Sequence, residues 1–250
     1  MIIDTHCHIY RSEMKNAEEI IKKAAKKDIS IILNGIDPLS NKEVLELSEK
    51  YENVYAALGY FYSFADEITD EDIILLDNQL NNDKVIAVGE IGLDYYHTKD
   101  NKEKQKELFE KMLKLAKKHN LPVIVHSRKS LQDTLDILKK YDVAGSMHCY
   151  QGSGEMAQEF IKLGFYIGIG GPVTYPNNKK IKKMIKKVDI AHMLIETDSP
   201  YLTPEEKRGE ENTPLNLKYI IRKLSEELDI NENEIIRITT ENAKKLFNID

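Results

Sequence analysis

Six side chains that bind divalent metals well stand at the ends of short apolar runs in this 250-residue chain. The first run leads into two histidines separated by one residue, His6 and His8. Four later runs each lead into one further ligand, in the order Glu90, His126, His148 and Asp198. Histidine nitrogens combined with carboxylate oxygens suit zinc, manganese or iron, and suit magnesium less well. The sequence therefore predicts a site for divalent metal ions.

The order of these ligands along the chain predicts two ions. His6 and His8 point to the same side of an extended strand, so we expect them to hold one ion together. His126 and His148 follow neighbouring strands, so we expect them to hold the second. Glu90 lies between these pairs in strand order, and its two carboxylate oxygens are expected to bridge the ions.

Asp198 is expected to complete the shell of the first ion and to accept the proton of the attacking water. Two ions about 3.5–4 Å apart make a bound water acidic and hold a phosphoryl or carbonyl oxygen beside it. Asp198 and the bridging Glu90 are thus the residues predicted to act in catalysis. The expected cofactors are two divalent ions: zinc, manganese or magnesium.

Eight apolar runs alternate with helical patterns along the chain. The runs are continuously apolar, which is typical of parallel strands covered by helices. Helices are predicted near residues 17–27, 41–50, 70–81, 102–119, 131–141, 155–163, 179–188, 215–228 and 232–247. Strands are predicted near residues 2–4, 29–33, 54–58 and 165–169, with four others ending at Glu90, His126, His148 and Asp198.

This alternation predicts one α/β domain over residues 1–250, folded as a (β/α)₈ TIM-like barrel. Such barrels carry their active sites at the carboxyl ends of the strands, where all six ligands would meet. A doubly wound open sheet fits less well, because ligands from five strands would then be spread across its width.

The composition indicates a globular protein without a membrane span. The net charge is −6, 41% of residues are hydrophobic and 31% are charged. No apolar run approaches the roughly 20 residues of a membrane span, and no leader pattern opens the chain. The negative charge argues against a nucleic-acid binder of the basic-patch kind. Cys7 and Cys149 suit packing positions in a reducing cytoplasm, and no obligatory protein partner is predicted.

Six segments of the chain resemble, in order, motifs of the TatD-type metal-dependent hydrolases of the amidohydrolase superfamily. They are DTHCH at 4–8, GEIGLDYY at 89–96, VIVHSR at 123–128, HCYQGS at 148–153, ETDSPYLTP at 196–204 and TTENAKKLF at 239–247. The resemblance implies a TIM-like barrel and the same six metal ligands. It also implies deoxyribonuclease or related hydrolase activity, with Asp198 near the attacking water.

One motif departs from that family. After the third strand the family usually carries Gly-x-His-Pro, whereas this chain reads Gly59-Tyr60-Phe61-Tyr62. Phe61 stands where the substrate-facing histidine is expected, which leaves the metal ligands intact but puts the substrate in doubt. Phe61 and Tyr62 would be suited to stack on a base, an interaction of roughly 1–3 kcal/mol per base. The alternative is that these rings only pack the loop.

Further substrate contacts are predicted around the metal ligands. Arg128 follows His126 by two residues, and its planar guanidinium suits phosphate oxygens. Ser153 lies in a Gly-Ser-Gly turn whose free N–H groups would suit an anion, although an ordinary strand-to-helix connection explains the turn equally well. Arg208, with Asn212 nearby, is a weaker candidate in the loop after Asp198. The lysine-rich stretch at 179–187 is better explained as a solvated helix face.

These observations favour a metal-dependent phosphodiesterase that acts on DNA ends or short oligonucleotides. An ester or amide hydrolase, for example of an acyl group on a nucleic-acid carrier, is the alternative, because the same ions polarise a carbonyl. A metal-binding scaffold without turnover is a third hypothesis. The histidine missing at Phe61 is its only support, and the complete ligand set opposes it.

Overall fold

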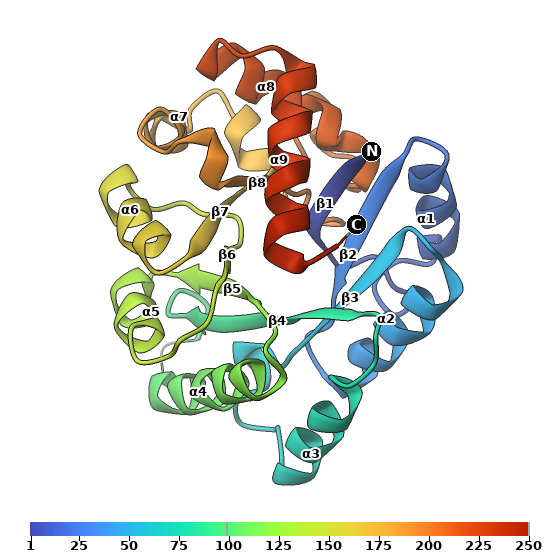
Figure 1. Cartoon of the computed structure of the whole chain (residues 1–250), viewed down its shortest axis with the longest axis vertical. Helices are drawn as coiled ribbons and strands as arrows, with labels where there is room; N and C mark the ends of the chain where they lie inside the picture. The colour runs from blue at the N-terminus through green and yellow to red at the C-terminus, as the bar shows by residue number, and fades with distance from the viewer. Residues whose placement is uncertain (99, 250) are drawn as a thin grey trace.

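Eight parallel strands form one sheet, ordered β1 to β8, in the computed structural model, which describes residues 1–98 and 100–249. The strands are β1 (Ile2–Cys7), β2 (Ile29–Asn34), β3 (Val54–Leu58), β4 (Val85–Asp94), β5 (Val123–Arg128), β6 (Gly145–Met147), β7 (Phe165–Ile169) and β8 (Met193–Ile195). The sheet curls into a nearly closed barrel with helices around its outside (Figure 1). The predicted (β/α)₈ barrel in a single domain is confirmed.

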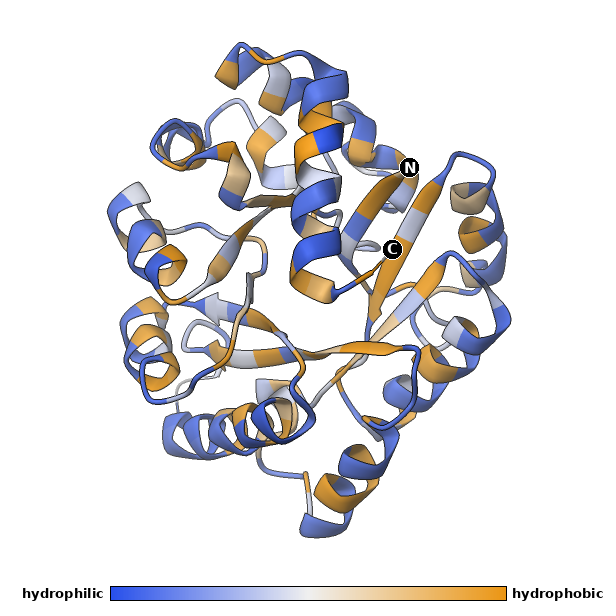
Figure 2. Ribbon diagram, in the orientation of Figure 1, coloured by the Kyte–Doolittle hydropathy of each residue, from blue (hydrophilic) through white to orange (hydrophobic). Residues whose placement is uncertain are grey.

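Most helices lie between consecutive strands and form the outer layer, and the last two follow β8. They are α1 (Ala17–Ala25), α2 (Pro38–Lys50), α3 (Asp70–Gln79), α4 (Lys102–His119), α5 (Leu131–Leu138), α6 (Gly154–Lys162), α7 (Lys179–Ile185), α8 (Leu217–Leu228) and α9 (Glu232–Phe247). Their hydrophobic residues face the sheet and their polar residues face outward (Figure 2). Among the described residues, no helix has both the length and the apolar character that crossing a membrane requires.

Strand ladders join each pair of neighbours from β1 to β8, whereas isolated contacts bridge the remaining seam between β8 and β1. The Asp198 N–H donates to the carbonyl of His6 (2.9 Å), and the His8 N–H donates to the carbonyl of Ser199 (2.6 Å). The Thr5 hydroxyl donates to the carbonyl of Ile195 (3.1 Å). The seam therefore brings the ligands from both ends of the chain together.

The interior of the barrel is divided between an apolar end and a polar end. A cluster that includes Ile3, Ile86 and Leu194 of the strands packs against Ala243 and Phe247 of α9. Helix α9 thus covers the amino-terminal end of the barrel (Figure 1). The polar ligand side chains gather at the opposite, carboxyl end.

Several predicted strand ends are wrong. Glu90 and His126 lie inside strands, because β4 and β5 stay paired beyond them, with Gly92 opposite His126 and Asp94 opposite Arg128. Strand β1 runs on to Cys7, β6 ends one residue before His148, and β8 ends three residues before Asp198. The six side chains still lie at the same end of the barrel. Their position along the barrel axis depends on how neighbouring strands pair, and not on where each strand ends.

The start of α2 is set by a helix cap. Helix α2 begins at Pro38, earlier than predicted, because the Asp37 carboxylate accepts from the Ser40 N–H (2.7 Å) and caps the helix.

Cys7 and Cys149 are both free thiols, and Cys7 is fully buried, in agreement with the predicted packing role.

Candidate metal centre and active site

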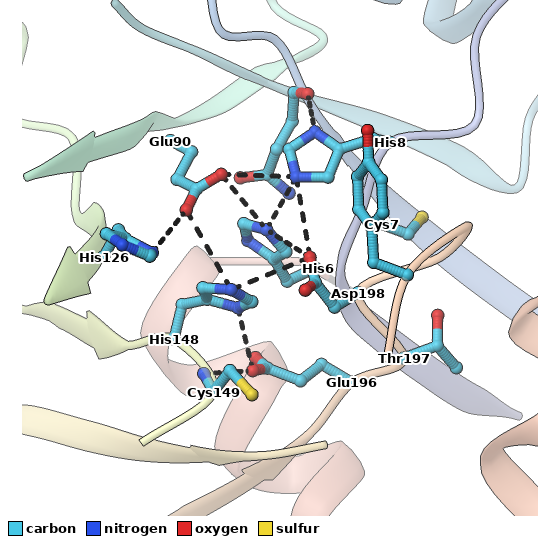
Figure 3. Close-up of polar contacts among 12 residues, drawn as sticks. His6, Cys7, His8, Glu90, His126, His148, Cys149, Glu196, Thr197 and Asp198 are labelled. Carbon is cyan, nitrogen blue, oxygen red and sulfur yellow. Dashed lines mark hydrogen bonds and ion pairs between the residues drawn. The ribbon is translucent and has the colours of Figure 1, made fainter. Parts of the chain in front are cut away.

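The six predicted ligands meet in one cluster at the carboxyl end of the barrel (Figure 3). Within the described residues, they form three overlapping groups whose ligand atoms lie within 4.8 Å of one another. The groups are His6, His8 and Glu90; His6, His148 and Asp198; and Glu90, His126 and His148. Five of the six side chains are buried, and His126 is half-buried. Sequence reasoning therefore found all six residues of this cluster.

The predicted first ion site consists of His6, His8 and one oxygen of Glu90. The two Nε2 atoms lie 3.0 Å apart. Glu90 Oε2 lies 3.2 Å from His8 Nε2 and 3.6 Å from His6 Nε2. Two atoms bound at about 2.1 Å to a shared ion are separated by roughly 3.0–3.4 Å. The donor set and its spacing therefore fit one divalent ion.

The predicted second ion site consists of His126, His148 and the other oxygen of Glu90. Glu90 Oε1 lies 3.2 Å from His126 Nδ1 and 3.9 Å from His148 Nε2. The two carboxylate oxygens thus face different histidine pairs, which is the arrangement of a bridging ligand.

Asp198 lies between the two sites. Its Oδ1 atom is 3.4 Å from His6 Nε2 and 3.7 Å from the Nε2 atoms of both His8 and His148. The sequence assigned Asp198 to the first ion, and the structure adds the contact with His148. One oxygen of Asp198 therefore faces the space between the two predicted ions.

Both carboxylates are held in their ionised form. Burial alone would raise the pKa of Glu90, but the charge of His6 and hydrogen bonds from the histidines hold the pKa well below its usual value. Burial also opposes ionisation of Asp198, yet His148 and His6 lower its pKa. At neutral pH both side chains are ready to bind a cation.

The pKa values of two histidines in the cluster are raised, in contrast to those of the carboxylates. Burial favours neutral His6, but the charges of Glu90 and Asp198 outweigh it and raise the pKa of His6 to about 10. Hydrogen bonds to Asp94 and Glu90 likewise overcome burial and raise the pKa of His126 to about 9. A metal ion therefore has to displace protons from these two rings.

Sequence reasoning missed the groups that contact the outer nitrogens of three ligand rings. The carbonyl of Asn34 lies 2.9 Å from His8 Nδ1, and Asp94 Oδ2 lies 3.0 Å from His126 Nε2. Such outer contacts fix the orientation of a ligand ring.

Glu196 is the third group of this kind. Its Oε1 atom lies 2.9 Å from His148 Nδ1, at a distance that suits an ion pair but at an angle outside that of a hydrogen bond. Their spacing in the sequence could have identified the two carboxylates. Asp94 follows Glu90 by four residues and Glu196 precedes Asp198 by two, inside motifs already noted.

The buried Glu196 carboxylate lies against the backbone at Gly168 and at Cys149. A side chain at Gly168 of β7 would place its Cβ 2.6 Å from Glu196 Oε2. The N–H of Cys149 donates to Glu196 Oε1. Gly168 and Cys149 thus fix Glu196 behind His148.

The predicted aromatic contacts lie next to the second ion site. The Phe61 ring meets the His126 ring edge-on at 5.0 Å, and the Tyr62 ring stacks on it at 5.6 Å. Tyr62 is only 7% exposed, so its ring mainly packs His126. Phe61 is half-buried and keeps part of its ring accessible.

Arg128 extends from the end of β5 over an exposed aromatic ring. Its guanidinium lies 4.1 Å from the centre of the Tyr96 ring, and Nη1 lies 3.4 Å from His97 Nε2. Tyr96 is 54% exposed and was not singled out from the sequence. Among the described residues, no carboxylate forms an ion pair with Arg128, so its guanidinium fork is open to a ligand.

The other residues predicted to contact substrate interact with neighbouring residues of the protein. Ser153 caps α6, where its hydroxyl accepts from the Met156 N–H (3.2 Å). Arg208 lies over the Tyr175 ring at 5.7 Å, its Nε is 3.5 Å from Glu205, and it lines a cavity of about 310 Å³. Asn212 is fully buried and donates to the carbonyl of Thr197 (2.8 Å), so it supports the Asp198 loop.

The chain is similar in sequence and in fold to known proteins. The sequence profile of the family described as TatD related DNase matches residues 3–248. YabD of Bacillus subtilis (strain 168), an uncharacterized metal-dependent hydrolase, is 41% identical over 255 residues, covering 100% of both chains. The crystal structure of YjjV, a TatD homologue from Escherichia coli K12, is similar with a TM-score of 0.94 at 34% identity, covering 100% of this chain and 98% of that one. A hydrolase of the TatD family from Entamoeba histolytica shares the fold with a TM-score of 0.85 at 23% identity, over 98% of this chain and 97% of that one.

Proposed function

The chain belongs to the TatD related DNase family, and from this membership we propose that it is a hydrolase that cleaves phosphodiester bonds at DNA ends or in short oligonucleotides with two divalent ions. Metal-dependent hydrolysis agrees with the relatives that match the whole chain. The number of ions and the phosphodiester substrate go beyond those names and rest on the geometry of the pocket.

The observation that carries the proposal is the orientation of Glu90. Its Oε2 atom faces His6 and His8, and its Oε1 atom faces His126 and His148. A carboxylate shared between two ligand pairs in this way is the mark of a two-metal centre. Such ions, when bound, acidify a water and stabilise charge on the oxygens of a phosphoryl group.

The chain's own residues have distinct tasks in this proposal. Asp198 accepts the proton that the attacking water loses, since its ionised carboxylate faces both ion sites. Arg128 binds a phosphate oxygen through its fork, while the Tyr96 ring beneath keeps the guanidinium in place. The accessible part of Phe61 contacts a base beside the second ion site.

The test is a substrate panel on metal-stripped protein reconstituted with zinc, manganese or magnesium. It compares a labelled single strand, a duplex with recessed ends and an acyl ester, each with and without chelator. We expect metal-dependent cleavage of the oligonucleotides, abolished by His6→Ala and by Asp198→Asn with the fold retained by circular dichroism. Asp142→Asn, at a surface position between α5 and β6, is the matched control and should keep the wild-type rate.

Each other outcome has a definite meaning. Hydrolysis of the acyl ester without cleavage of any oligonucleotide would replace this proposal with the ester-hydrolase alternative. Absence of all turnover in protein with measured, bound metal would support a scaffold. Wild-type cleavage by Asp198→Asn with its metals in place would remove the assigned role of Asp198.

A further inference from the structure

His126 differs from the other three ligand histidines in the nitrogen that faces the pocket. His6, His8 and His148 present Nε2 to the carboxylates of the cluster. His126 instead presents Nδ1 to Glu90 Oε1 at 3.2 Å, while its Nε2 lies 3.0 Å from Asp94 Oδ2. Two carboxylates of the same strand therefore hold the two nitrogens of one ring.

The pairing of β4 with β5 explains this arrangement. Glu90 and Asp94 both reach the His126 ring from β4, with Gly92 between them in the chain. Gly92 pairs with His126 in the ladder. A Cβ at Gly92 would lie 2.0 Å from the carbonyl oxygen of His126, and its φ of +133° is open only to glycine. The glycine lets His126 lie close above β4, between the two carboxylates.

Asp94 is itself fixed on all sides. The side chain is fully buried, and its Oδ1 atom accepts from the N–H groups of Tyr96 (2.8 Å) and His97 (2.9 Å). The side chain of Gln105 holds the main chain of Asp94, accepting from its N–H (2.9 Å) and donating to its carbonyl (3.1 Å). These contacts hold the Asp94 carboxylate beside the His126 ring.

We propose that Asp94 is a positioning residue that holds His126 with Nδ1 toward the second ion and thereby sets the affinity of that ion separately from the first. Asp94 accepts the Nε2–H, so Nδ1 is the nitrogen that gives up its proton and is left for the metal. An anionic acceptor also makes the ring a better donor to the metal. Loss of such an outer partner typically weakens metal binding about 10–100-fold.

The same carboxylate oxygen serves a second ring. Asp94 Oδ2 also lies 3.0 Å from Nδ1 of His97, whose side chain is 52% exposed. Removing His97 leaves the bond between Asp94 and His126 in place. His97→Ala and Asp94→Ala therefore separate the effect on His126 from a general effect on this loop.

The experiment is a zinc titration of stripped protein against a competing chelator, with ion stoichiometry from elemental analysis. Asp94→Ala should weaken one of the two sites about 10–100-fold and leave the other within about twofold. Asp94→Asn keeps the shape but not the charge, so it should shift the same site in the same direction by a smaller factor. His97→Ala should bind both ions as the wild type does. No substrate is used, so failure of the proposed phosphodiesterase activity does not affect this test.

Gln105→Ala is the control for loosened structure, because it removes the support of the Asp94 main chain but keeps the carboxylate. Unfolding of each stripped variant by urea reports the loss of stability. The proposal is overturned if Asp94→Ala binds both ions normally or weakens both sites equally. It is also overturned if Gln105→Ala, at equal loss of stability, reproduces the loss of affinity, or if the wild type binds a single ion. Should Asp94→Ala fail to fold, Asp94→Asn decides by the same criteria.

Discussion

Asp4 accepts two hydrogen bonds from Thr197 across the seam between β1 and β8. The Thr197 N–H donates to Oδ1 at 2.9 Å and its hydroxyl donates to Oδ2 at 2.6 Å, although the residues are 193 positions apart. Asp4 precedes His6 by two residues, and Thr197 immediately precedes Asp198. This pair therefore fixes the distance between His6 and Asp198, predicted metal ligands that lie far apart in the sequence.

The first prediction concerns this bridge. Asp4→Ala leaves the Thr197 N–H buried without its partner, which costs about 1–3 kcal/mol in the free energy of unfolding. The Thr197 hydroxyl keeps Ser199 Oγ as a partner at 2.6 Å. Asp4→Ala should also weaken the binding of the first ion, because His6 and Asp198 lose their common support. Urea unfolding and zinc titration measure the two effects.

A matched surface pair provides the control. Asp72 of α3 accepts from both the N–H and the hydroxyl of Thr69, at 2.9 and 2.8 Å, in an exposed helix cap. Asp72→Ala should cost less stability and leave zinc affinity unchanged. Equal losses for Asp4→Ala and Asp72→Ala would contradict the role assigned to the seam.

The second prediction concerns the space behind His148. Gly168→Ala places a methyl group 2.6 Å from the Glu196 carboxylate, so Glu196 has to move away from His148. Overpacking of this kind costs typically about 1–3 kcal/mol. Gly170→Ala is the control, because a Cβ there meets its nearest atom at 3.6 Å. We expect lower stability and weaker metal binding for Gly168→Ala alone, and similar behaviour of both variants would refute the argument.

The third prediction follows from the raised pKa values of His6, about 10, and His126, about 9. The folded, metal-stripped protein keeps protons that the unfolded chain releases near pH 6.5. The stability they contribute is fully present below pH 6.5 and is lost as the pH rises through 9 and 10. The unfolding free energy of stripped protein should thus fall between pH 7 and 10.

Zinc changes this pH dependence, because bound histidines are already unprotonated. The zinc-loaded protein should lack the decrease, and calorimetry at pH 7.5 in two buffers of different ionisation enthalpy should show proton release on binding. A flat pH dependence of stability in the stripped protein, or zinc binding without proton release, would contradict the assigned pKa directions.

The fourth prediction concerns phosphate binding by Arg128. Arg128→Gln should raise KM for oligonucleotides about tenfold or more, since hydrogen bonds to charged groups contribute about 1.5–3 kcal/mol. Arg128→Lys should restore only part of this binding, because an ammonium group lacks the planar fork. Arg222→Gln, an exposed arginine of α8 at 4.0 Å from Glu232, is the control. An equal KM for Arg128→Gln and Arg222→Gln would remove Arg128 from the substrate site.

The sequence predicted the barrel and the clustering of the six side chains because both depend on local patterns. Apolar runs bounded by helices indicate parallel strands, and a histidine or carboxylate after such a run is visible without any knowledge of packing. Glu90 lies in the cluster as expected, even though its strand continues to Asp94. Polar residues near the end of a run suggest a loop, yet here they stay in the ladder because β5 pairs with them.

The supporting residues could not be identified in this way, because their roles depend on register and on distant contacts. Asp94 is significant only because Gly92 pairs with His126, and Asp4 only because β8 returns to β1. The burial of Tyr62 against His126 likewise depends on how the loop after β3 folds over β5.

The most direct test of the two-metal account is a crystal structure of zinc- or manganese-reconstituted protein with anomalous diffraction from the metal. The account predicts two ions about 3.5–4 Å apart, each bound by a different oxygen of Glu90. One ion should lie with His6 and His8, and the other with His126 and His148. A single ion in the pocket, or none, from protein crystallised with excess metal would contradict it.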